Sequence, residues 1–437
     1  MCGPPAARTP QVPYTNPGAF FPAYDAAKKK YLSALLARVD GNALQAVATE
    51  SRGGIPCTIP ALSKDVPDDK CLETVSRQCG GQNAHVDVVF DDGVTWLARL
   101  RLDDPLLPPA AVQTCVLESE VATLQFLAKT KVLAPRVFAH VSTAANNPVG
   151  TPYILMEKLP GKPLDWSSAS PAQRERVLEQ MAEIYLELEK HPLPATGCLA
   201  LSDGNGEDVQ VGPFVQPPCF VTPTSALGPF STLAESYMAI IRHQMAMLAT
   251  GEYGSLRVDN YLAFLWRAEA LPKLVDDDRN SNTGPFYLKH YDDKGDHILV
   301  DANYNITGII DWEWASFETK PYAFSAPCML WPVGDFYEGS NVLSSEEVRF
   351  AELLSIQGRG DLAQLVRTGR PWQRFLFFLG GGLPQSREEF EPLFHGLQKA
   401  LADDSDDVDE EYAEWKAKRL VKFAMDDPNL ADLALQK

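Results

Sequence analysis

Basic residues are under-represented in this chain, which has 39 Lys and Arg against 58 Asp and Glu and a formal net charge of −19. A nucleic-acid surface needs a basic stripe, so this balance argues against nucleic-acid binding. The charge is compatible with a cationic substrate, although an acidic surface more often serves only solubility.

Paired cysteines and long apolar runs are also lacking. The eight cysteines are scattered without a Cys-x-x-Cys motif, which argues against a zinc site and indicates reduced thiols in a cytoplasmic setting. No apolar run of about eighteen residues occurs, and residues 1–10 have no signal-peptide core. We therefore expect no membrane span. No heptad pattern is evident, which leaves the oligomeric state open.

The composition is otherwise that of a folded protein, with 45% hydrophobic and 22% charged residues in 437. That length predicts one large or two moderate globular units. Residues 1–20, rich in proline and small residues, read as a disordered arm. Apolar residues at helical spacing predict a helix over 24–39 and a shorter one over 43–49.

Strand-type sequence follows. We predict strands over 74–79, 84–90 and 94–102, with an Asp-Gly hairpin turn at 91–93 between the last two. Gly80-Gly81-Gln82-Asn83 separates the first two strands, and either a plain β-turn or a phosphate-binding loop fits those residues. Alternation in the third strand places Leu97, Arg99 and Arg101 on one face.

The next segments predict a helix over 118–129 that carries Glu120, and a strand over 153–156 that ends before Glu157-Lys158-Leu159-Pro160-Gly161. Beyond this point the pattern becomes mainly helical. We expect a helix over 172–190 capped by Ser170, then a surface excursion over 192–230. The further helices expected are 233–249, 260–271, 346–366, 371–379, a segment from 383 to 401 that Pro392 kinks or divides, and 411–425.

The stretch from Phe286 to Trp314 contains two short apolar runs, 298–300 and 306–310, around a polar turn. β-Branched runs around an Asn/Asp turn predict a hairpin. A tight hairpin brings Asp292, which precedes the first run, towards Asp311, which follows the second. Clustered carboxylates repel each other, and they persist where a cation or a proton relay needs them. An ordinary hairpin with solvated acids is the alternative.

This segment resembles the catalytic segment of the aminoglycoside phosphotransferase and choline kinase group, which has a protein-kinase-like fold. His290-Tyr291-Asp292 fits the His-x-Asp motif of that group, and the strands ending at Asp301 and Asp311 fit its later part. The chain looks most like fungal-type members, given residues 54–57 and 312–314. The resemblance covers roughly residues 54–401.

The resemblance implies an α+β fold of two lobes. It divides the chain into an N-terminal extension with a helix (1–53), an antiparallel-sheet N-lobe (54–158), a helical C-lobe with the catalytic hairpin (159–401), and an acidic tail with a helix (402–437). The implied reaction transfers the γ-phosphate of ATP to a hydroxyl of a small molecule, for which a cationic molecule is one candidate.

The resemblance also assigns roles to residues. Asp292 is the catalytic residue that takes the acceptor proton, and Lys294 neutralises developing charge. Asp311 binds Mg²⁺. Trp312, Glu313 and Trp314 line the acceptor pocket, although packing explains the two tryptophans equally well. The nucleotide-binding candidates are Gly80, Gly81, Asn83, Leu97, Arg99, Glu120, Met156, Glu157 and Lys158. Within this set Arg99 binds phosphate, Glu120 pairs with it, and the backbone at 157–158 meets adenine.

Three departures from the family pattern open a second interpretation. His297 stands where the family has an Asn metal ligand, and imidazole suits Mn²⁺ better than Mg²⁺. Tyr291 replaces the usual Gly, and Arg99 replaces the usual Lys. The chain could therefore be a weak or inactive pseudokinase that acts as a binding or scaffold protein. Lys289, just before the motif, is expected at a solvent-exposed strand edge.

Overall fold

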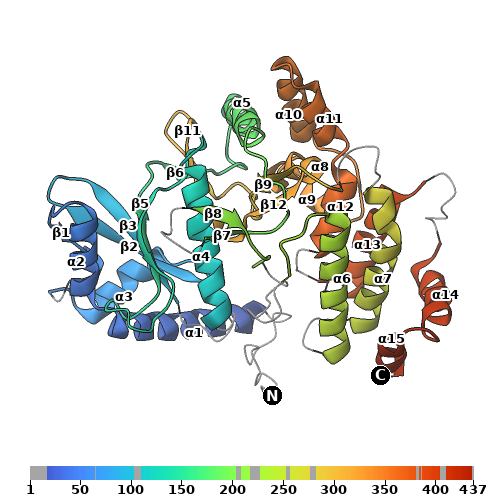
Figure 1. Cartoon of the computed structure of the whole chain (residues 1–437), viewed down its shortest axis with the longest axis horizontal. Coiled ribbons are helices and arrows are strands. Elements are labelled where there is room, and N and C mark those ends of the chain that lie inside the picture. Colours follow the sequence, from blue (N-terminus) through green and yellow to red (C-terminus); the bar gives the residue numbers. More distant parts are fainter. Residues whose placement is uncertain are drawn as a thin grey trace. The chain divides into compact units, whose positions relative to one another are not determined.

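The computed structural model describes residues 17–63, 65–102, 110–202, 208–216, 227–251, 256–275, 282–379, 383–384, 386–403 and 410–435. The chain divides into two compact units (Figure 1): Met1–Lys129 with Leu133–Pro160 form the first, and Thr130–Val132 with Gly161–Lys437 form the second. Residues 1–16 of the expected arm and residues 404–409 of the expected acidic tail lie outside the described residues.

One antiparallel sheet forms the centre of the first unit. In the described part of this unit the strands follow the order β1-β2-β3-β5-β4. Their bounds are β1 Cys57–Thr58, β2 Asn83–Phe90, β3 Thr95–Arg101, β4 Val137–Val141 and β5 Tyr153–Glu157. The predicted hairpin between β2 and β3 is confirmed, and Gly93 at its turn has φ of 85°, a conformation that favours glycine.

The two faces of this sheet have different neighbours. Inward residues such as Val86, Ala98 and Leu100 form a core with the helices α1 (Pro17–Arg38), α2 (Gly41–Ser51) and α3 (Asp68–Arg77). These helices contribute residues such as Leu35 and Val75, and the short helix η1 (Pro60–Leu62) packs at the rim. The other face carries Arg99 towards helix α4 (Ala110–Leu127). Alternation along the strands therefore places the core residues on one face of the sheet and Arg99 on the other, as predicted.

The strand predicted over 74–79 is wrong, because helix α3 runs through most of it. Leu72 and Val75 lie three residues apart, which fits one face of a helix as well as an irregular strand. In the structure the segment is helical, and Val75 on this helix is buried in the core. Gly80 and Gly81 therefore lie in a turn between a helix and strand β2, closed by a bridge between Cys79 and Ala84.

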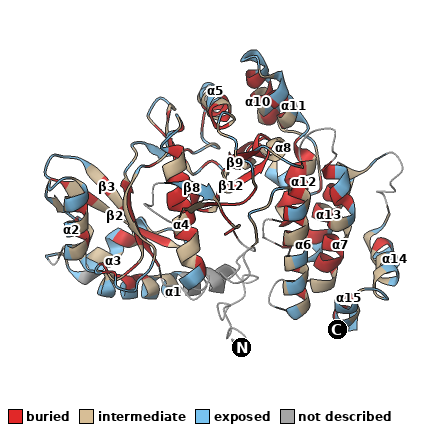
Figure 2. Ribbon diagram, viewed as in Figure 1, coloured by how far each residue is buried: buried red, intermediate tan, exposed pale blue. Residues whose placement is uncertain are grey.

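The second unit is mainly helical. Its helices are α5 (Pro171–Leu188), α6 (Leu233–Thr250), α7 (Arg257–Leu274), α8 (Lys320–Ala323), α9 (Val333–Tyr337), α10 (Ser345–Ile356), α11 (Gly360–Arg367), α12 (Arg370–Leu379), α13 (Arg387–Leu401), α14 (Tyr412–Phe423) and α15 (Pro428–Leu435). The predicted Ser170 cap of α5 is confirmed as a capping box. Figure 2 shows buried residues along the facing sides of α6, α7, α12 and α13. The predicted α+β architecture, with a small antiparallel sheet in one unit and mostly helices in the other, is confirmed.

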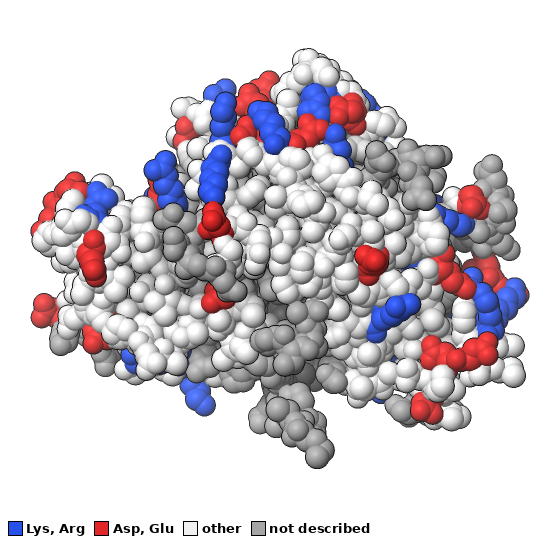
Figure 3. Space-filling view, viewed as in Figure 1, with Lys and Arg blue, Asp and Glu red and all other residues white. Residues whose placement is uncertain are grey.

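Two helix predictions need correction. The single helix expected over 346–366 is two helices, because the chain turns at Gly358, where φ is 76°. Helix α13 continues through Pro392, so the division that was one of the two effects expected there does not occur. On the surface of this unit, oppositely charged side chains lie side by side over α5 and α10 (Figure 3), where Arg174 pairs with Glu346 at 3.1 Å and Arg349 pairs with Glu175 at 2.5 Å.

Short strands of the second unit hold the catalytic segment. Strands β10 (Ile298–Val300) and β11 (Ile306–Ile309) form the predicted hairpin, and β6 (Lys162–Pro163) extends it. Strand β9 (Phe286–Lys289) pairs with β12 (Ser316–Thr319), and β7 (Leu199–Leu201) pairs with β8 (Val209–Val211). Gly161, at the start of this unit, has φ of 107°, and a Cβ there would lie 2.4 Å from the Thr307 hydroxyl oxygen. Any side chain at Gly161 would therefore displace β6 from the hairpin.

Candidate active site

Asp292, predicted to be catalytic, and Asp311, predicted to bind metal, both approach the imidazole of His297. Nδ1 of His297 lies 3.8 Å from a carboxylate oxygen of Asp292, and Nε2 lies 3.3 Å from one of Asp311. The hairpin explains this approach, because Ile298 pairs with Ile309 and so brings the two ends of the hairpin together. The side chains of Asp292 and Asp311 are about one-third exposed, at 33% and 36%, so both remain open to a ligand.

His290, the first residue of the His-x-Asp motif, is a partly buried structural residue. Its Nε2–H donates to the Ile310 carbonyl at 3.0 Å, and its ring lies 4.7 Å from that of Trp312. Burial lowers the pKa of His290 below its ordinary value of 6.5, so the neutral form is favoured. His290 therefore ties the start of the catalytic segment to the end of β11.

Lys294 lies beside Asp292. Its Nζ is 2.9 Å from a carboxylate oxygen of Asp292 and 3.9 Å from one of Asp296. Burial by itself would lower the pKa of Lys294, but the hydrogen bond and the charge of Asp292 raise it above its ordinary value. The ammonium group is half-exposed and stays charged near neutral pH, as a cation that neutralises developing charge must.

Asp311 has a backbone conformation that few residues adopt. Its φ is 62° and its ψ is 54°, in the left-handed region, immediately before the short helix η3 (Trp312–Trp314). Asp is one of the few non-glycine residues that tolerate this region, and such conformations cluster at functional sites. The turn buries the next two side chains and leaves the Asp311 carboxylate partly exposed.

The three predicted acceptor residues have different surroundings. Trp312 is 1% exposed and its indole N–H donates to the Ile309 carbonyl at 2.9 Å, which is the packing role that the sequence left open. Glu313 is also buried. Trp314 is partly exposed, and its carbonyl accepts a hydrogen bond from Gln216 at 3.1 Å. Of the three, Trp314 alone has side-chain surface open to an acceptor.

Metal-binding capacity in this region rests on few protein ligands. Among the described residues, no group of three or more His, Cys, Asp or Glu side chains is arranged to hold a metal ion. A nucleotide-bound Mg²⁺ usually takes one or two protein carboxylates and completes its shell with water and phosphate oxygens. Asp311 with its neighbour His297 fits such a minimal ligand set.

In the first unit, the predicted ion pair between Arg99 and Glu120 is confirmed. A guanidinium nitrogen of Arg99 contacts a carboxylate oxygen of Glu120, and the two side chains are only 8% and 4% exposed. Arg99 projects from β3, and Glu120 projects from α4 onto the same face of the sheet. A desolvated charge-assisted pair of this kind fixes the orientation of the guanidinium group.

The glycine turn is anchored by an arginine that the sequence argument left without a role. Arg101 donates to the Gln82 side-chain oxygen at 2.7 Å, to that of Asn83 at 3.4 Å and to that of Gln113, on α4, at 3.2 Å. A Cβ at Gly81 would meet no atom within 4 Å, and one at Gly80 would meet only the Asn83 carbonyl oxygen, at 3.7 Å. The fold therefore does not itself require glycine at either position.

The remaining nucleotide-binding candidates lie on neighbouring strands of the same sheet. Leu97 on β3 pairs with Met156 on β5 in the strand register. The Glu157 N–H donates to the Arg136 carbonyl at 2.8 Å. Lys158 forms an ion pair of 2.6 Å with Asp87 on β2. Their nucleotide-binding roles remain predictions.

Lys289 is not the solvent-exposed residue that the sequence led us to expect. It is 7% exposed and forms an ion pair of 2.6 Å with Asp293. The i, i+4 spacing of these residues is visible in the sequence, but in an extended chain it does not bring the two side chains together; here the chain bends at Tyr291, just after β9.

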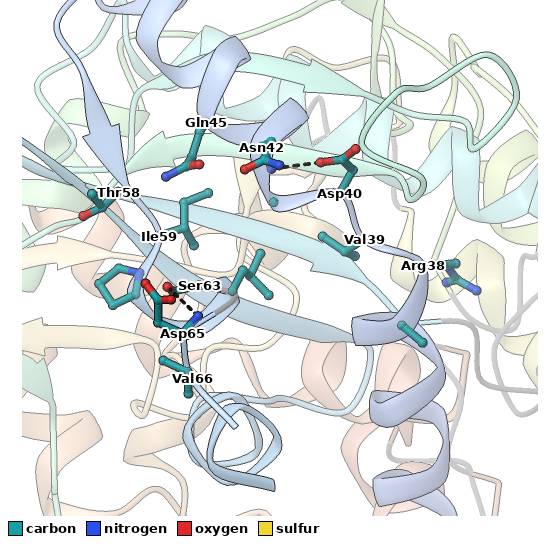
Figure 4. A pocket seen from close by; sticks show the side chains of 14 residues that line it. Arg38, Val39, Asp40, Asn42, Gln45, Thr58, Ile59, Ser63, Asp65 and Val66 are labelled. Carbon is teal, nitrogen blue, oxygen red and sulfur yellow. Dashed lines mark hydrogen bonds between the residues drawn. The ribbon is translucent and has the colours of Figure 1, made fainter. Parts of the chain in front are cut away.

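The described part of the first unit also contains a hollow of about 880 Å³, at the junction of α1, α2 and η1 (Figure 4). Asp40, Gln45 and Ser63 are among the residues that line it. Asp40 caps α2 by accepting from the backbone N–H groups of Asn42 and Ala43, which explains its place. None of the predicted site residues lines this hollow.

Comparison with protein families identifies the family of this chain. A profile of the phosphotransferase enzyme family, abbreviated APH, matches residues 83–318. The match begins with β2 and ends in β12, so it includes the Arg99–Glu120 pair and the whole catalytic segment. It confirms the resemblance that the sequence motifs indicated.

Curated relatives cover the chain only in part. A subtelomeric hrmA-associated cluster protein of Aspergillus fumigatus is 39% identical over 134 residues, which is 30% of this chain and 25% of that protein. The clavilactone A biosynthesis cluster protein Y of Ampulloclitocybe clavipes is 25% identical over 263 residues, 57% of this chain and 62% of that protein. The chain thus spans a quarter of the length of the first relative and less than two thirds of the second.

Solved structures with a similar course of the chain include a thermostable mutant of an aminoglycoside phosphotransferase in complex with ADP and hygromycin B. It is 14% identical, with a TM-score of 0.44, over 83% of this chain and 99% of that one. An ethanolamine kinase of Plasmodium vivax is 13% identical, with a TM-score of 0.40, over 79% of this chain and 80% of that one.

None of the helices within the described ranges is long and apolar enough to cross a membrane.

Proposed function

Because the chain belongs to the phosphotransferase enzyme family, we propose that it transfers the γ-phosphate of ATP to a hydroxyl group of a small molecule. The observation that carries this proposal is the convergence of Asp292 and Asp311 on one imidazole, with both carboxylates partly exposed and a lysine beside the first. Phosphoryl transfer depends mainly on positioning and on electrostatic stabilisation, and these groups supply both.

In this proposal Asp292 is the catalytic residue that orients the acceptor hydroxyl and accepts its proton. The ammonium group of Lys294, which lies 2.9 Å from an Asp292 carboxylate oxygen, then neutralises charge on the transferred group. A single ammonium can serve first the carboxylate and then the phosphoryl oxygens, because its flexible stem carries three rotatable donors.

Asp311 and His297 would hold the metal ion of the bound nucleotide. Nδ1 of His297 lies 3.1 Å from the Asp292 carbonyl oxygen, which can only accept, so Nδ1 carries a hydrogen. In the neutral imidazole the lone pair is then on Nε2, 3.3 Å from the Asp311 carboxylate. Two acceptors at that distance repel each other unless they share a cation. A proton or a metal ion between them removes the repulsion, and an imidazole ligand favours Mn²⁺ over Mg²⁺.

Arg99 would bind the nucleotide phosphates, held in place by Glu120. The open backbone at Gly80 and Gly81 allows close approach of phosphate oxygens, while Leu97 and Met156 offer apolar side chains to the adenine ring. The backbone at Glu157 and Lys158 would bind its edge. ATP and its metal ion, when bound, supply the phosphoryl group and neutralise its charge; the chain supplies position and fixed dipoles.

A small cationic acceptor fits the charges of the segment best. Asp292, Asp296 and Asp311 lie within one segment, and the net charge of the chain is −19. The partly exposed ring of Trp314 could contact a cation through its face. A relative named for a clavilactone A biosynthesis cluster is consistent with an acceptor that is made in a biosynthetic pathway.

The test is a thermal-shift screen with ATP and with GTP, each with Mg²⁺ and with Mn²⁺. A nucleotide at a hundred times its dissociation constant stabilises a protein by about 2.7 kcal/mol, which is readily seen as a higher melting temperature. The shift should need a metal and should disappear in Asp311→Ala. The matched control is Asp432→Ala, which removes an exposed carboxylate on α15. If neither ATP nor GTP raises the melting temperature with either metal, the proposal is refuted.

A further inference from the structure

The catalytic motif lies inside a five-residue loop that an ion pair closes. Lys289 is the last residue of β9, and its ammonium nitrogen lies 2.6 Å from a carboxylate oxygen of Asp293. His290, Tyr291 and Asp292 lie between these two residues. The side chains of Lys289 and Asp293 are only 9% and 17% exposed, so water competes little for the interaction.

The charges of this pair are mutually supported. Burial by itself would lower the pKa of Lys289, but the negative charge of Asp293 and its hydrogen bond raise that pKa above its ordinary value. Tyr322 adds the face of its ring, 5.5 Å from the Lys289 ammonium. Lys289 therefore stays charged inside the unit, where an isolated ammonium would lose its proton.

Asp293 also docks the loop on a second segment of the chain. Its other carboxylate oxygen accepts the backbone N–H of Cys328 at 2.8 Å, and its carbonyl accepts that of Met329 at 3.0 Å. Both donors belong to the short helix η4 (Cys328–Leu330). Gly295 completes the contact: its φ is 103°, and a Cβ there would lie 3.2 Å from Cβ of Met329.

We propose that Lys289 and Asp293 are positioning residues that clasp the loop onto η4 and so fix the place of the Asp292 carboxylate. This inference rests on the proposed phosphotransferase function. Neither residue needs to touch substrate, since each acts through the backbone on either side of the motif. A displacement of about 1 Å at a reacting group can lower a rate about a hundredfold, so a clasp on the loop bears directly on turnover.

Stability alone is a weaker explanation of the pair. A buried ion pair can often be replaced by neutral side chains of similar volume without loss of stability, although removing one partner leaves a costly buried charge. The pair does fix the orientation of the Lys289 and Asp293 side chains, because a charge-assisted hydrogen bond is short and oriented. The two explanations differ in what a neutral replacement of both residues does to turnover.

The experiment compares the wild-type chain with Lys289→Met and with the double variant Lys289→Met/Asp293→Asn. The double variant keeps an oxygen that can accept the Cys328 N–H and leaves no buried charge. Its melting temperature should therefore return to near the wild-type value, while that of Lys289→Met falls. The control is Arg77→Met, which removes an exposed i, i+4 ion pair on α3.

Turnover of ATP is measured as phosphate release, together with hydrogen exchange of the backbone amides of Cys328 and Met329. In the double variant we expect kcat to fall by about 10- to 100-fold with little change in the KM for nucleotide, because the nucleotide contacts are intact. Exchange at the two amides should become faster, since without the ion pair to Lys289 the side chain and carbonyl of residue 293 are less firmly held in place to accept from them.

Three results would overturn the inference. A wild-type kcat in the double variant would remove the positioning role and leave the proposed function intact. Unchanged exchange at Cys328 and Met329 would show that the pair does not dock the loop. If the wild-type chain itself releases no phosphate, the proposed function fails and the positioning role fails with it, whatever the exchange rates.

Discussion

The buried ion pair between Arg99 and Glu120 allows stability and nucleotide binding to be separated. Replacing Glu120 by Leu leaves the Arg99 guanidinium group, whose side chain is 8% exposed, without the carboxylate that it contacts. Breaking a buried pair by removing one partner destabilises a protein by about 3–5 kcal/mol, because the remaining charge is desolvated and uncompensated. For a unit of this size that loss lowers the melting temperature by roughly 10 °C.

The double variant Arg99→Met/Glu120→Leu should behave differently. It places two apolar side chains of similar volume where the pair was, so most of the lost stability should return. Nucleotide binding should not return, because the cation for the phosphates is gone. We therefore expect the single variant to be unstable and the double variant to be stable but defective in binding.

Unfolding in urea followed by circular dichroism gives the stability, and isothermal titration with ATP and Mn²⁺ gives the affinity. Glu73→Gln is the matched control: it breaks an exposed ion pair with Arg77, and such pairs contribute only about 0–1 kcal/mol. If the double variant binds nucleotide as tightly as the wild-type chain, Arg99 does not bind phosphate. If the single variant is as stable as the wild type, the pair is not the desolvated contact that its burial indicates.

Three further predictions follow from single residues. His297→Asn should shift the metal preference of nucleotide binding from Mn²⁺ towards Mg²⁺, and equal preference in both proteins would show that His297 is not a ligand. Burial raises the pKa of Glu318 from 4.5 to about 7; the stability that its protonated form contributes is present below pH 4.5 and lost as pH rises through 7. Glu318→Gln should thus gain about 3 kcal/mol over the wild type between pH 4.5 and 8 in urea unfolding, and a difference independent of pH would contradict this. Gly81→Ala should leave the melting temperature unchanged, because a Cβ there meets no atom within 4 Å, but should weaken nucleotide binding in titration.

The strands and the hairpin of the catalytic segment were predictable because their signals are local. β-Branched runs around polar turns gave β2, β3, β10 and β11, and strand alternation gave the side of the sheet on which Arg99 meets Glu120. The approach of Asp292 to Asp311 followed from hairpin geometry alone. In each case, residues close in sequence carry the information.

The errors concern contacts that only the tertiary structure sets. Residues 74–79 have a pattern that fits helix or strand, and the burial of Val75 in the sheet core decided for helix. Lys289 appeared exposed because lysines are seldom buried, and it contacts its partner Asp293 only because the chain bends at Tyr291, just after β9. The roles of Arg101 and of η4 likewise depend on partners distant in sequence.

Phosphate release from ATP by the wild-type chain and by Asp292→Asn tests the central claim most directly. The substitution is nearly isosteric, so the melting temperature should be unchanged, and Asp432→Asn on the exposed face of α15 serves as the control. We expect release to fall by about 10²- to 10⁴-fold in Asp292→Asn, the usual contribution of a positioned base, with nucleotide affinity nearly intact. Equal release by the two proteins, or nucleotide binding without release by the wild type, would contradict the account and identify the chain as a kinase-shaped binding protein.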